Sequence, residues 1–265
     1  MAQINSGFVL VGALMAWSDR AGNPARHLAA LRWLAKVARA GAVTGCFVFL
    51  FAVVAFAQDA KAQQDRRQNA PGEFDFYVLS LSWSPSYCEA SAERGSRRSA
   101  DLQCGGRPFA FVVHGLWPQY ERGFPEYCKV PAPRLNRAIV GAMLDLMPSP
   151  RLVYHEWDKH GTCSGLSASA YFETVRKARA AVKIPETYLD HEKPTMVSPG
   201  DVTVAFLNAN PGLTHQQIAV TCDSKRLSEV RICMSKEFAF KDCPETARRA
   251  CRRDKVAMPA VRGGR

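Results

Sequence analysis

The sequence predicts an α+β fold, with a central antiparallel sheet flanked by helices and cross-linked by disulfides. Two observations favour this class. Segments with strand patterning and segments with helical spacing follow one another without the regular alternation that is typical of parallel sheets. Nine cysteines are present, and eight remain once Cys46 is assigned to a predicted leader. An even number of cysteines in an exported chain indicates four disulfides.

The first 57 residues are predicted to be a signal or leader. Val43 to Ala57 is apolar and uncharged, and it follows a basic stretch at 32–39. A transmembrane anchor is the alternative, but this run is shorter than the ~20 residues that span a bilayer. The 42 residues ahead of the run are long for a leader, which leaves Met15 open as an alternative start. We expect a cleaved signal, no stable membrane association and a periplasmic or secreted product.

The elements after the leader are assigned in chain order. Residues 58–73 are polar and form a predicted disordered lead-in. The predicted strands are Phe74–Trp83, Pro108–His114, Ile218–Cys222 and Glu229–Phe240. The predicted helices cover residues 134–147, 151–160, 169–182 and 198–208. Ser198 is the predicted N-cap of the last helix, with Pro199 at its first position.

Connections between these elements are predicted from polar and turn-forming residues. Residues 93–103 form a polar loop held by Cys88 and Cys104. Gly115 and Pro118 are expected to turn the chain out of the second strand. The last segment, 252–265, is predicted to be a basic, flexible tail, with contact to RNA phosphates as the alternative.

The charge balance indicates a preference for anionic partners without defining a function. The formal net charge is +11, and residues 58–265 carry 30 basic and 23 acidic side chains, a net charge of +7. A basic surface attracts polyanions over long range. Many secreted proteins are basic without binding nucleic acid, so the function has to be argued from motifs.

The segment 155–163 reads His-Glu-Trp-Asp-Lys-His-Gly-Thr-Cys. On a helix, His155, Glu156, Lys159 and His160 occupy adjoining parts of one face, whereas Trp157 and Asp158 point elsewhere. A carboxylate beside an imidazole raises the pKa of the histidine and orients its ring. A lysine beside both favours a bound anion. This set can hold a phosphate and transfer a proton to or from it.

A zinc site is the alternative for this segment, because His-Glu-x-x-His is a zinc protease signature. The second histidine stands one residue too late, at His160, and is turned about 140° from the first. Lys159 occupies the ligand position and would repel a cation. No Cys-x-x-Cys pair occurs elsewhere. We therefore expect no metal and no cofactor.

The segment 111–118 supplies a further histidine. His114 ends the predicted second strand, where a lone histidine is more often a structural hydrogen-bonding group. Trp117 and Tyr120 follow it, and exposed aromatic rings after a strand can stack on bases. Core packing is the alternative for Trp117.

Both segments resemble the two active-site segments of the ribonuclease T2 family, secreted endoribonucleases of the transferase type. His-Gly-Leu-Trp-Pro at 114–118 is similar to the first, and residues 155–163 to the second, in the same order. Residues 76–88 resemble the opening strand of that family. The resemblance covers about residues 74–251, the predicted ribonuclease domain.

The resemblance implies cleavage of single-stranded RNA, not DNA, through a 2′,3′-cyclic phosphate, with broad base specificity, no metal and a monomeric enzyme. His160 resembles the general base and His114 the general acid. Glu156 and Lys159 would stabilise the transition state, and His155 would bind the phosphate. Trp117 and Tyr120 are the base-binding candidates. Gln119 stands where some fungal relatives carry an acid, which leaves base preference open.

The resemblance also implies a pairing of the cysteines. The expected disulfides are Cys128–Cys163, Cys222–Cys251, Cys233–Cys243 and Cys88–Cys104. Two other functions stay open at this point. One is an RNA-binding or signalling protein that does not depend on cleavage, and the other is a phosphodiesterase that acts on other nucleotides.

Overall fold

The computed structural model describes residues 68–95, 102–105 and 107–261. The predicted leader, and the predicted lead-in up to residue 67, lie outside them. Residues 68–73 form turns, and the amide of Gly72 donates to the carbonyl of Cys163 at 2.9 Å. Within the described residues, no helix combines the length and apolar character needed to cross a membrane.

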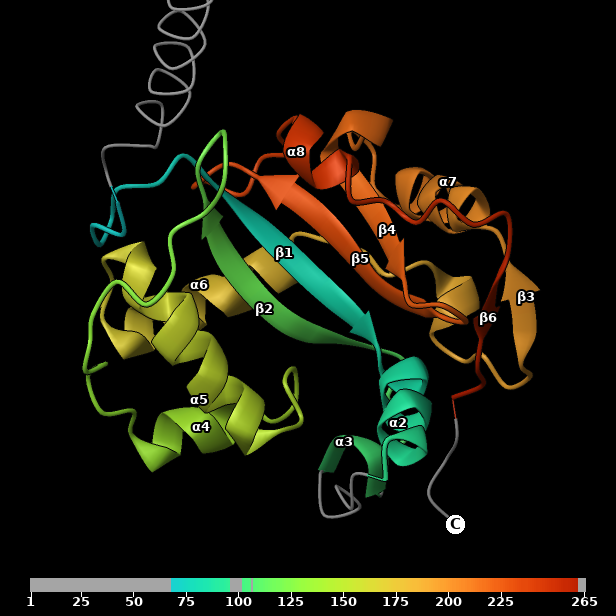
Figure 1. Ribbon diagram of the computed structural model, residues 1–265, viewed down its shortest axis with the longest axis horizontal. Coiled ribbons are helices and arrows are strands. Elements are labelled where there is room, and N and C mark those ends of the chain that lie inside the picture. Colours follow the sequence, from blue (N-terminus) through green and yellow to red (C-terminus); the bar gives the residue numbers. More distant parts are fainter. Residues whose placement is uncertain (1–67, 96–101, 106, 262–265) are drawn as a thin grey trace, which may run out of the picture. The chain divides into compact units, whose positions relative to one another are not determined.

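A four-stranded antiparallel sheet forms the centre of the fold (Figure 1). Its strand order is β2-β1-β5-β4, so β1 lies between β2 and β5. The strands are β1 Phe76–Trp83, β2 Phe111–Gln119, β4 Ile218–Cys222 and β5 Leu227–Met234. A second, two-stranded sheet pairs β3 Thr195–Val197 with β6 Val256–Met258. The predicted α+β class is confirmed.

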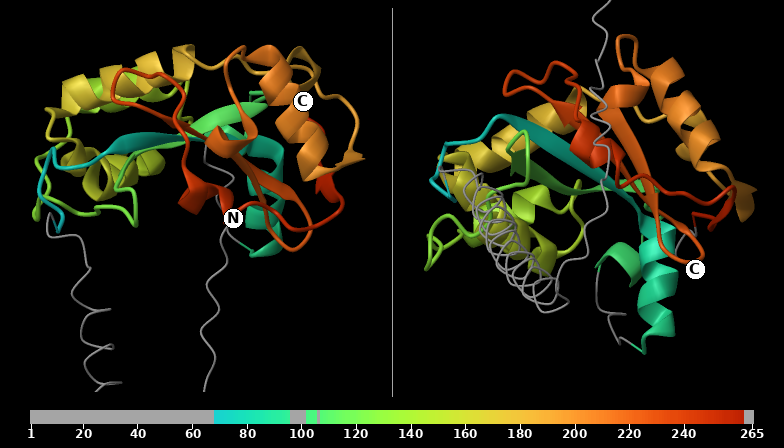
Figure 2. Two further views of the ribbon diagram at one scale, coloured as in Figure 1. Left: turned by 90° about the horizontal axis from the view of Figure 1, so that it is seen from above. Right: turned by 45° about the horizontal axis from the view of Figure 1, so that its top comes forward.

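Helices cover the sheet at opposite edges (Figures 1 and 2). The helices are α2 Ser84–Glu93, α3 Leu102–Gly105, α4 Arg137–Met143, α5 Pro150–Lys159, α6 Ala168–Ala180, α7 Pro199–Ala209 and α8 Pro244–Ala247. Helices α5 and α6 contact β2, whereas α7 contacts β4. The predicted cap of α7 is confirmed, because the Ser198 hydroxyl accepts from the Asp201 amide at 3.0 Å.

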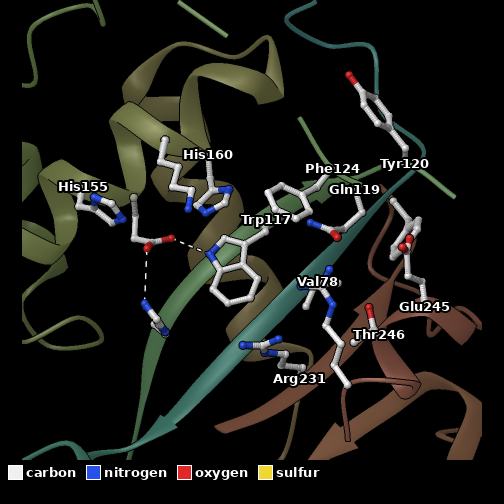
Figure 3. Close-up of a pocket in the computed structure, with 15 residues that line it drawn as sticks. Val78, Trp117, Gln119, Tyr120, Phe124, His155, His160, Arg231, Glu245 and Thr246 are labelled. Atoms are coloured by element: carbon white, nitrogen blue, oxygen red, sulfur yellow. Dashed lines mark hydrogen bonds and ion pairs between the residues drawn. The ribbon is translucent and has the colours of Figure 1, made fainter. Parts of the chain in front are cut away.

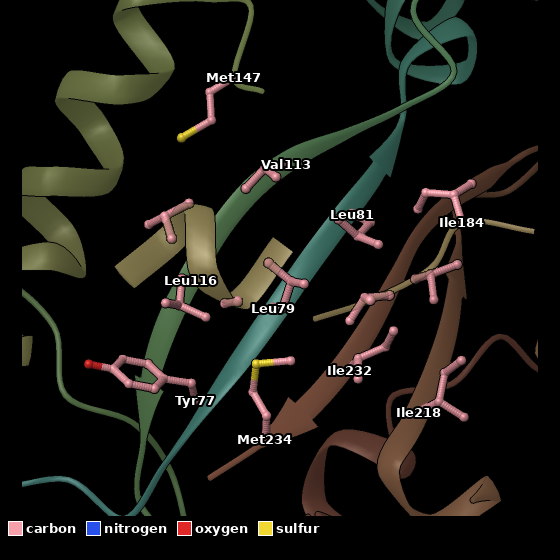
Figure 4. Packing of buried hydrophobic residues seen from close by; sticks show 14 of the residues in the cluster. Tyr77, Leu79, Leu81, Val113, Leu116, Met147, Ile184, Ile218, Ile232 and Met234 are labelled. Atoms are coloured by element: carbon pink, nitrogen blue, oxygen red, sulfur yellow. The ribbon is translucent and has the colours of Figure 1, made fainter. Parts of the chain in front are cut away.

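The main core lies on one face of the sheet (Figure 4). Leu79 and Leu81 of β1 and Ile232 of β5 are fully buried there. The other face of β1 carries Phe76 and Val78, which pack in a smaller cluster. Because β1 is covered on both faces, its pattern is that of a central strand, as predicted.

Helix α4, Arg137–Met143, is shorter than the predicted 134–147, and four further sequence predictions differ from the structure. The second strand does not run from Pro108 to His114 but from Phe111 to Gln119, because pairing with β1 extends along this whole length. Two short helices, α2 and α3, flank the predicted 93–103 loop and are joined by Cys88–Cys104. Strand β5 ends at Met234, and the chain then turns at Phe238, which has a positive φ of 69°.

The fourth difference is the predicted flexible tail. Val256 and Met258 are fully buried in β6, and the Trp83 indole N–H donates to the Pro259 carbonyl at 3.0 Å. Apolar burial and strand pairing therefore order this segment despite its basic residues. The structure contains the four expected disulfides, Cys88–Cys104, Cys128–Cys163, Cys222–Cys251 and Cys233–Cys243.

Candidate active site

A pocket of about 290 Å³ lies against β1, β2 and β5, beside the C-terminal end of α5 (Figure 3). It contains every candidate residue that the sequence analysis selected for catalysis and binding. The lining residues are Phe76, Val78, His114, Trp117, Gln119, Tyr120, Phe124, His155, Glu156, Lys159, His160, Arg231, Glu245, Thr246 and Arg249.

A β-bulge brings His114 into this pocket. Ser80 of β1 pairs with Gly115 and Leu81 pairs with Val113, so His114 is an extra residue without a partner in the register. The extra residue reverses the alternation of β2, and Val113 and Leu116 therefore both face the core (Figure 4). Trp117, after the bulge, is directed to the pocket together with His114.

Gly115 allows α5 to approach the bulge closely. A Cβ atom at this position would lie 2.0 Å from Oε2 of Glu156 and 2.4 Å from Nε1 of Trp117. No side chain fits at these distances, so glycine is required here by space. The close approach places the Glu156 carboxylate directly beside the histidine of β2.

Helix α5 presents the second motif as predicted. The Ser149 hydroxyl caps its first turn by accepting from the Leu152 amide, and Pro150 occupies the first position. His155, Glu156, Lys159 and His160 all line the pocket. Their neighbours point elsewhere: Trp157 is buried in the core and donates to the Pro133 carbonyl at 2.8 Å, and Asp158 is exposed.

His114 lies between two carboxylates. Its Nδ1 is hydrogen-bonded to Oε1 of Glu229, and its Nε2 lies 3.6 Å from Oε1 of Glu156. Burial alone would lower the pKa of His114. The hydrogen bond and the charges of these two carboxylates outweigh that cost and raise the pKa above its ordinary value. His114 therefore favours the protonated state.

Glu156 is 1 % exposed and accepts a hydrogen bond from Nε1 of Trp117 at 2.7 Å (Figure 3). Burial raises its pKa to about 7, although His114 and Trp117 act in the opposite direction. The sequence analysis expected a carboxylate on this helix to raise the pKa of a histidine on the same helix. Instead, Glu156 pairs across to His114 on β2, because Gly115 opens that approach.

His160 has the opposite electrostatic environment. The residue is 6 % exposed, and its ring centroid lies 5.4 Å from that of Trp117 with an interplanar angle of 33°. Its Nδ1 is buried without a hydrogen-bond partner in the part of the chain that the structure describes. Burial, with the positive charges of Lys159 and the neighbouring histidines, lowers the pKa of His160 to about 3. This imidazole is therefore neutral over most of the pH range.

His155 and Lys159 form one edge of the pocket. His155 is exposed, and burial of part of its ring together with the charge of Lys159 lowers its pKa. The Lys159 ammonium lies 3.5 Å from Oε2 of Glu126. The two side chains can approach an anion that enters between His114 and His160.

The two aromatic candidates differ in their surroundings. Trp117 lies between the His160 ring and the Arg231 guanidinium, which is 5.1 Å from its ring centroid. Tyr120 is 5 % exposed, and its hydroxyl accepts from the Asn69 amide at 3.1 Å. Their role in binding bases stays a prediction.

Several residues of the site were not predicted from the sequence. Glu229 and Arg231 lie on β5, and Phe124 packs beside His160 with a centroid distance of 6.5 Å. Glu229 and Arg231 could have been noticed as two charges at alternate positions of a mostly apolar strand, because residues two apart on a strand share one face. No group of three or more His, Cys, Asp or Glu side chains that could hold a metal occurs in the described ranges.

The model of the Ribonuclease T2 family matches residues 74–243. The chain belongs to this family. This T2 ribonuclease is 37% identical over 171 residues to a ribonuclease of Aeromonas hydrophila, a match that covers 63% of the chain and 74% of the relative. It is 26% identical over 201 residues to Ribonuclease I of Escherichia coli K12, covering 61% of the chain and 75% of the relative.

Solved structures show the same fold. An RNase-related protein from Calystegia sepium superposes with a TM-score of 0.57 at 22% identity, over 72% of this chain and 99% of that one. RNase NT, solved in complex with 5′-AMP, superposes with a TM-score of 0.51 at 26% identity, over 71% and 99% of the two chains. These structures show that the chain has the fold of its relatives, and its membership of the family makes it a ribonuclease.

Proposed function

We propose that this T2 ribonuclease cleaves single-stranded RNA internally, by metal-independent transesterification through a 2′,3′-cyclic phosphate and with broad base specificity. One observation carries the proposal. His114 from β2 and His160 from the end of α5 line the same pocket, and their environments shift their pKa values in opposite directions. Titratable groups with pKa values moved apart are the usual arrangement for paired acid and base catalysis.

His160 acts as the general base in this scheme. It is neutral at working pH, so it can accept the proton of the 2′-hydroxyl while that oxygen attacks phosphorus. His114 acts as the general acid and protonates the 5′-oxygen as its bond to phosphorus breaks. The products are a 2′,3′-cyclic phosphate and a free 5′-hydroxyl, and the enzyme ends with His160 protonated and His114 neutral.

The remaining site residues stabilise charge on the phosphate. Lys159 and His155 contribute positive charge or hydrogen bonds to the phosphoryl oxygens. Glu156, with a pKa of about 7, can carry a proton and donate it to an oxygen of the crowded transition state. Trp117 and Tyr120 are the proposed base-binding groups, and Gln119 at the same pocket supports broad specificity because an amide both donates and accepts.

Analysis of the product ends tests this proposal. RNA incubated with the enzyme should yield 2′,3′-cyclic phosphate ends, EDTA should leave the rate unchanged, and RNA with 2′-deoxy sugars should not be cut. A 5′-phosphate product would contradict the scheme. His114→Ala should lower kcat by about 10²–10⁴-fold. An equal effect of wild type and His114→Ala in cells would instead favour a function that does not depend on cleavage.

The proposed location is the periplasm or the exterior of the cell. Four disulfides support an oxidising compartment. The signal assignment for residues 1–57 and a monomeric state belong to the same proposal. Mass spectrometry of the exported protein should find an N-terminus after Ala57, and light scattering should give the mass of one chain.

A further inference from the structure

A closed cycle of side-chain contacts begins and ends at the imidazole of His114. Nδ1 is hydrogen-bonded to Oε1 of Glu229. The other oxygen of Glu229, Oε2, accepts from Nε and Nη2 of Arg231 at 2.9 and 2.7 Å. One oxygen is therefore fixed by a guanidinium, and the other is presented to the histidine.

The cycle of contacts closes on the opposite side of the imidazole. The Arg231 guanidinium lies over the Trp117 ring, and the Trp117 indole donates to Glu156 (Figure 3). Glu156 then approaches Nε2 of His114 at 3.6 Å, a longer distance than a hydrogen bond. The two ring nitrogens thus differ: Nδ1 is bonded, and Nε2 is available in the pocket.

Two serines of β1 make room for this contact. Strands β2 and β5 both pair with β1, so their backbones are about 10 Å apart. Ser80 pairs with Arg231 and Ser82 with Glu229, and residues that pair directly project to the same face. Because both β1 side chains are small, His114 and Glu229 can meet above the middle strand.

The charge of Glu229 determines which nitrogen of His114 carries a proton. Burial alone would raise the pKa of this carboxyl group, which is 8 % exposed. The hydrogen bond and charge of His114, with the charge of Arg231, instead lower the pKa to about 2. A carboxylate can only accept, so Nδ1 must donate to it. The transferable proton is then on Nε2.

We propose that Glu229, held by Arg231, is the positioning residue of His114, which fixes Nδ1 as the bonded nitrogen and directs Nε2–H toward the scissile phosphate. This inference rests on the proposed role of His114 as general acid. Other charged groups also face His114, namely Glu156, His155 and His160 from α5 and its end. Glu229 differs from these in making a direct hydrogen bond to the ring.

Glu229→Gln tests the proposal, because it keeps the size of the side chain and removes its charge. NMR titration of the imidazole nitrogens should show the pKa of His114 falling by about one unit or more. The alkaline limb of the kcat/KM profile should move to lower pH by the same amount. At pH 7, kcat should fall by about 10–100-fold while KM for a dinucleotide substrate stays within about twofold.

Two further variants separate positioning from folding. Glu229→Asp keeps the charge but lies farther from Nδ1, so the pKa of His114 and kcat should fall between wild type and Glu229→Gln. Glu173→Gln, an exposed carboxylate paired with Lys177 on α6, should change none of these quantities. An unchanged pKa of His114 in both Glu229 variants would overturn the proposal, whatever happens to activity.

The same measurements distinguish this inference from the proposed function. If His114→Ala cleaves RNA as fast as wild type, the general-acid role is wrong. The NMR titration of Glu229→Gln then still shows whether Glu229 holds the His114 imidazole in the wild-type enzyme. If His114→Ala is inactive and the NMR titration of Glu229→Gln matches wild type, the general-acid role stands and the positioning role is wrong.

Discussion

At the scale of single residues, the site gives chemically identical side chains different pKa values. His114 has carboxylate neighbours and is favoured as a cation, whereas His160 is buried beside a lysine and is favoured as a neutral base. The same contrast holds for the carboxylates, because the pKa of Glu156 is raised to about 7 and that of Glu229 is lowered to about 2. The balance between burial and the neighbouring charges decides each case.

The pH profile of kcat/KM should reflect these two histidines. In the proposed mechanism His160 must be unprotonated, so the rate should rise as pH increases through about 3. His114 must be protonated, so the rate should fall once pH exceeds its pKa, which lies above the ordinary value of 6.5. A broad acidic-to-neutral maximum is expected in steady-state assays with a dinucleotide substrate. A narrow maximum on the alkaline side would contradict the assignment of acid and base.

Glu156 should make the enzyme less stable as pH rises. Its pKa is about 7 in the folded state, whereas the ordinary value of 4.5 applies to the unfolded chain, so the native state holds the extra proton between these limits. The associated stability is present below pH 4.5 and lost as pH rises through 7. Glu156→Gln should therefore have a free energy of unfolding about 1–3 kcal/mol higher than wild type at pH 8, with little difference at pH 4. Urea unfolding curves at the two pH values measure this difference.

Glu173→Gln is the matched control for this experiment, because Glu173 is an exposed carboxylate of α6. Its unfolding curves should follow wild type at both pH values. Equal differences between Glu156→Gln and wild type at pH 4 and pH 8 would show that the buried carboxyl group has no raised pKa.

At the scale of elements, the bulge in β2 and the C-terminal end of α5 set the geometry of the site. The bulge places His114 on the pocket face, and Gly115 lets α5 approach. Trp117 follows on the same face and contacts Glu156. The separation between the two motifs is therefore set by one extra residue and one absent side chain.

Gly115→Ala should damage both stability and catalysis. The added methyl group would overlap the Glu156 carboxylate and the Trp117 indole, at 2.0 and 2.4 Å, so α5 must move away from β2. We expect a loss of about 1–3 kcal/mol in the free energy of unfolding, as for other overpacked sites. The rate kcat/KM should fall by at least about tenfold, because small displacements of catalytic groups are costly.

Gly141→Ala provides the comparison, because nothing lies within 4 Å of a Cβ at that position in α4. It should be neutral or slightly stabilising, and fully active, since alanine favours helices more than glycine does. Wild-type activity in Gly115→Ala would show that the close approach of α5 is not needed for cleavage.

The contrast between local and distant interactions explains which elements the sequence predicted. The cap at Ser198 and the apolar pattern of β1 are local signals, and both are confirmed. Gly115 and Pro118 have the local signature of a turn, yet pairing with β1 keeps them in a strand. A local pattern cannot represent a partner strand that is distant in the sequence.

The candidate site shows the same division. The helix face of α5 followed from spacing alone, and its four polar residues do share a pocket. Glu229 could not be found in this way, because it is 115 positions from His114 and meets it only across β1. The pairing of Glu156 with His114 also depends on the tertiary fold. Burial and the charge of Lys159 lower the pKa of His160, where a neighbouring carboxylate was expected to raise it.

At the scale of the whole molecule, the last described strand closes the fold. Val256 and Met258 are buried, and the Pro259 carbonyl accepts the indole N–H of Trp83 at the end of β1. The disulfide Cys222–Cys251 joins the end of β4 to the segment just before β6. The C-terminal segment is thus part of the core on which β1 depends.

A chain that ends at Asp254 should be markedly less stable than wild type. It loses β6 and the partner of Trp83, which together remove several buried apolar side chains. Burial of each such side chain contributes about 1.5–3 kcal/mol, so the thermal midpoint should fall by at least about 5 °C. A chain that ends at Val261 should melt as wild type does. Equal thermal midpoints for both truncations would show that residues 255–261 do not stabilise the fold, as expected of the flexible tail predicted from the sequence.

The strand order has a consequence for how the protein is made. Strand β5 occupies the position beside β1, but it is synthesised more than a hundred residues after the first motif. A nascent chain that has exposed both histidine segments therefore still lacks Glu229, Arg231 and half of the sheet. The pocket can therefore be completed only after β5, which follows both histidine segments in the chain, has paired with β1.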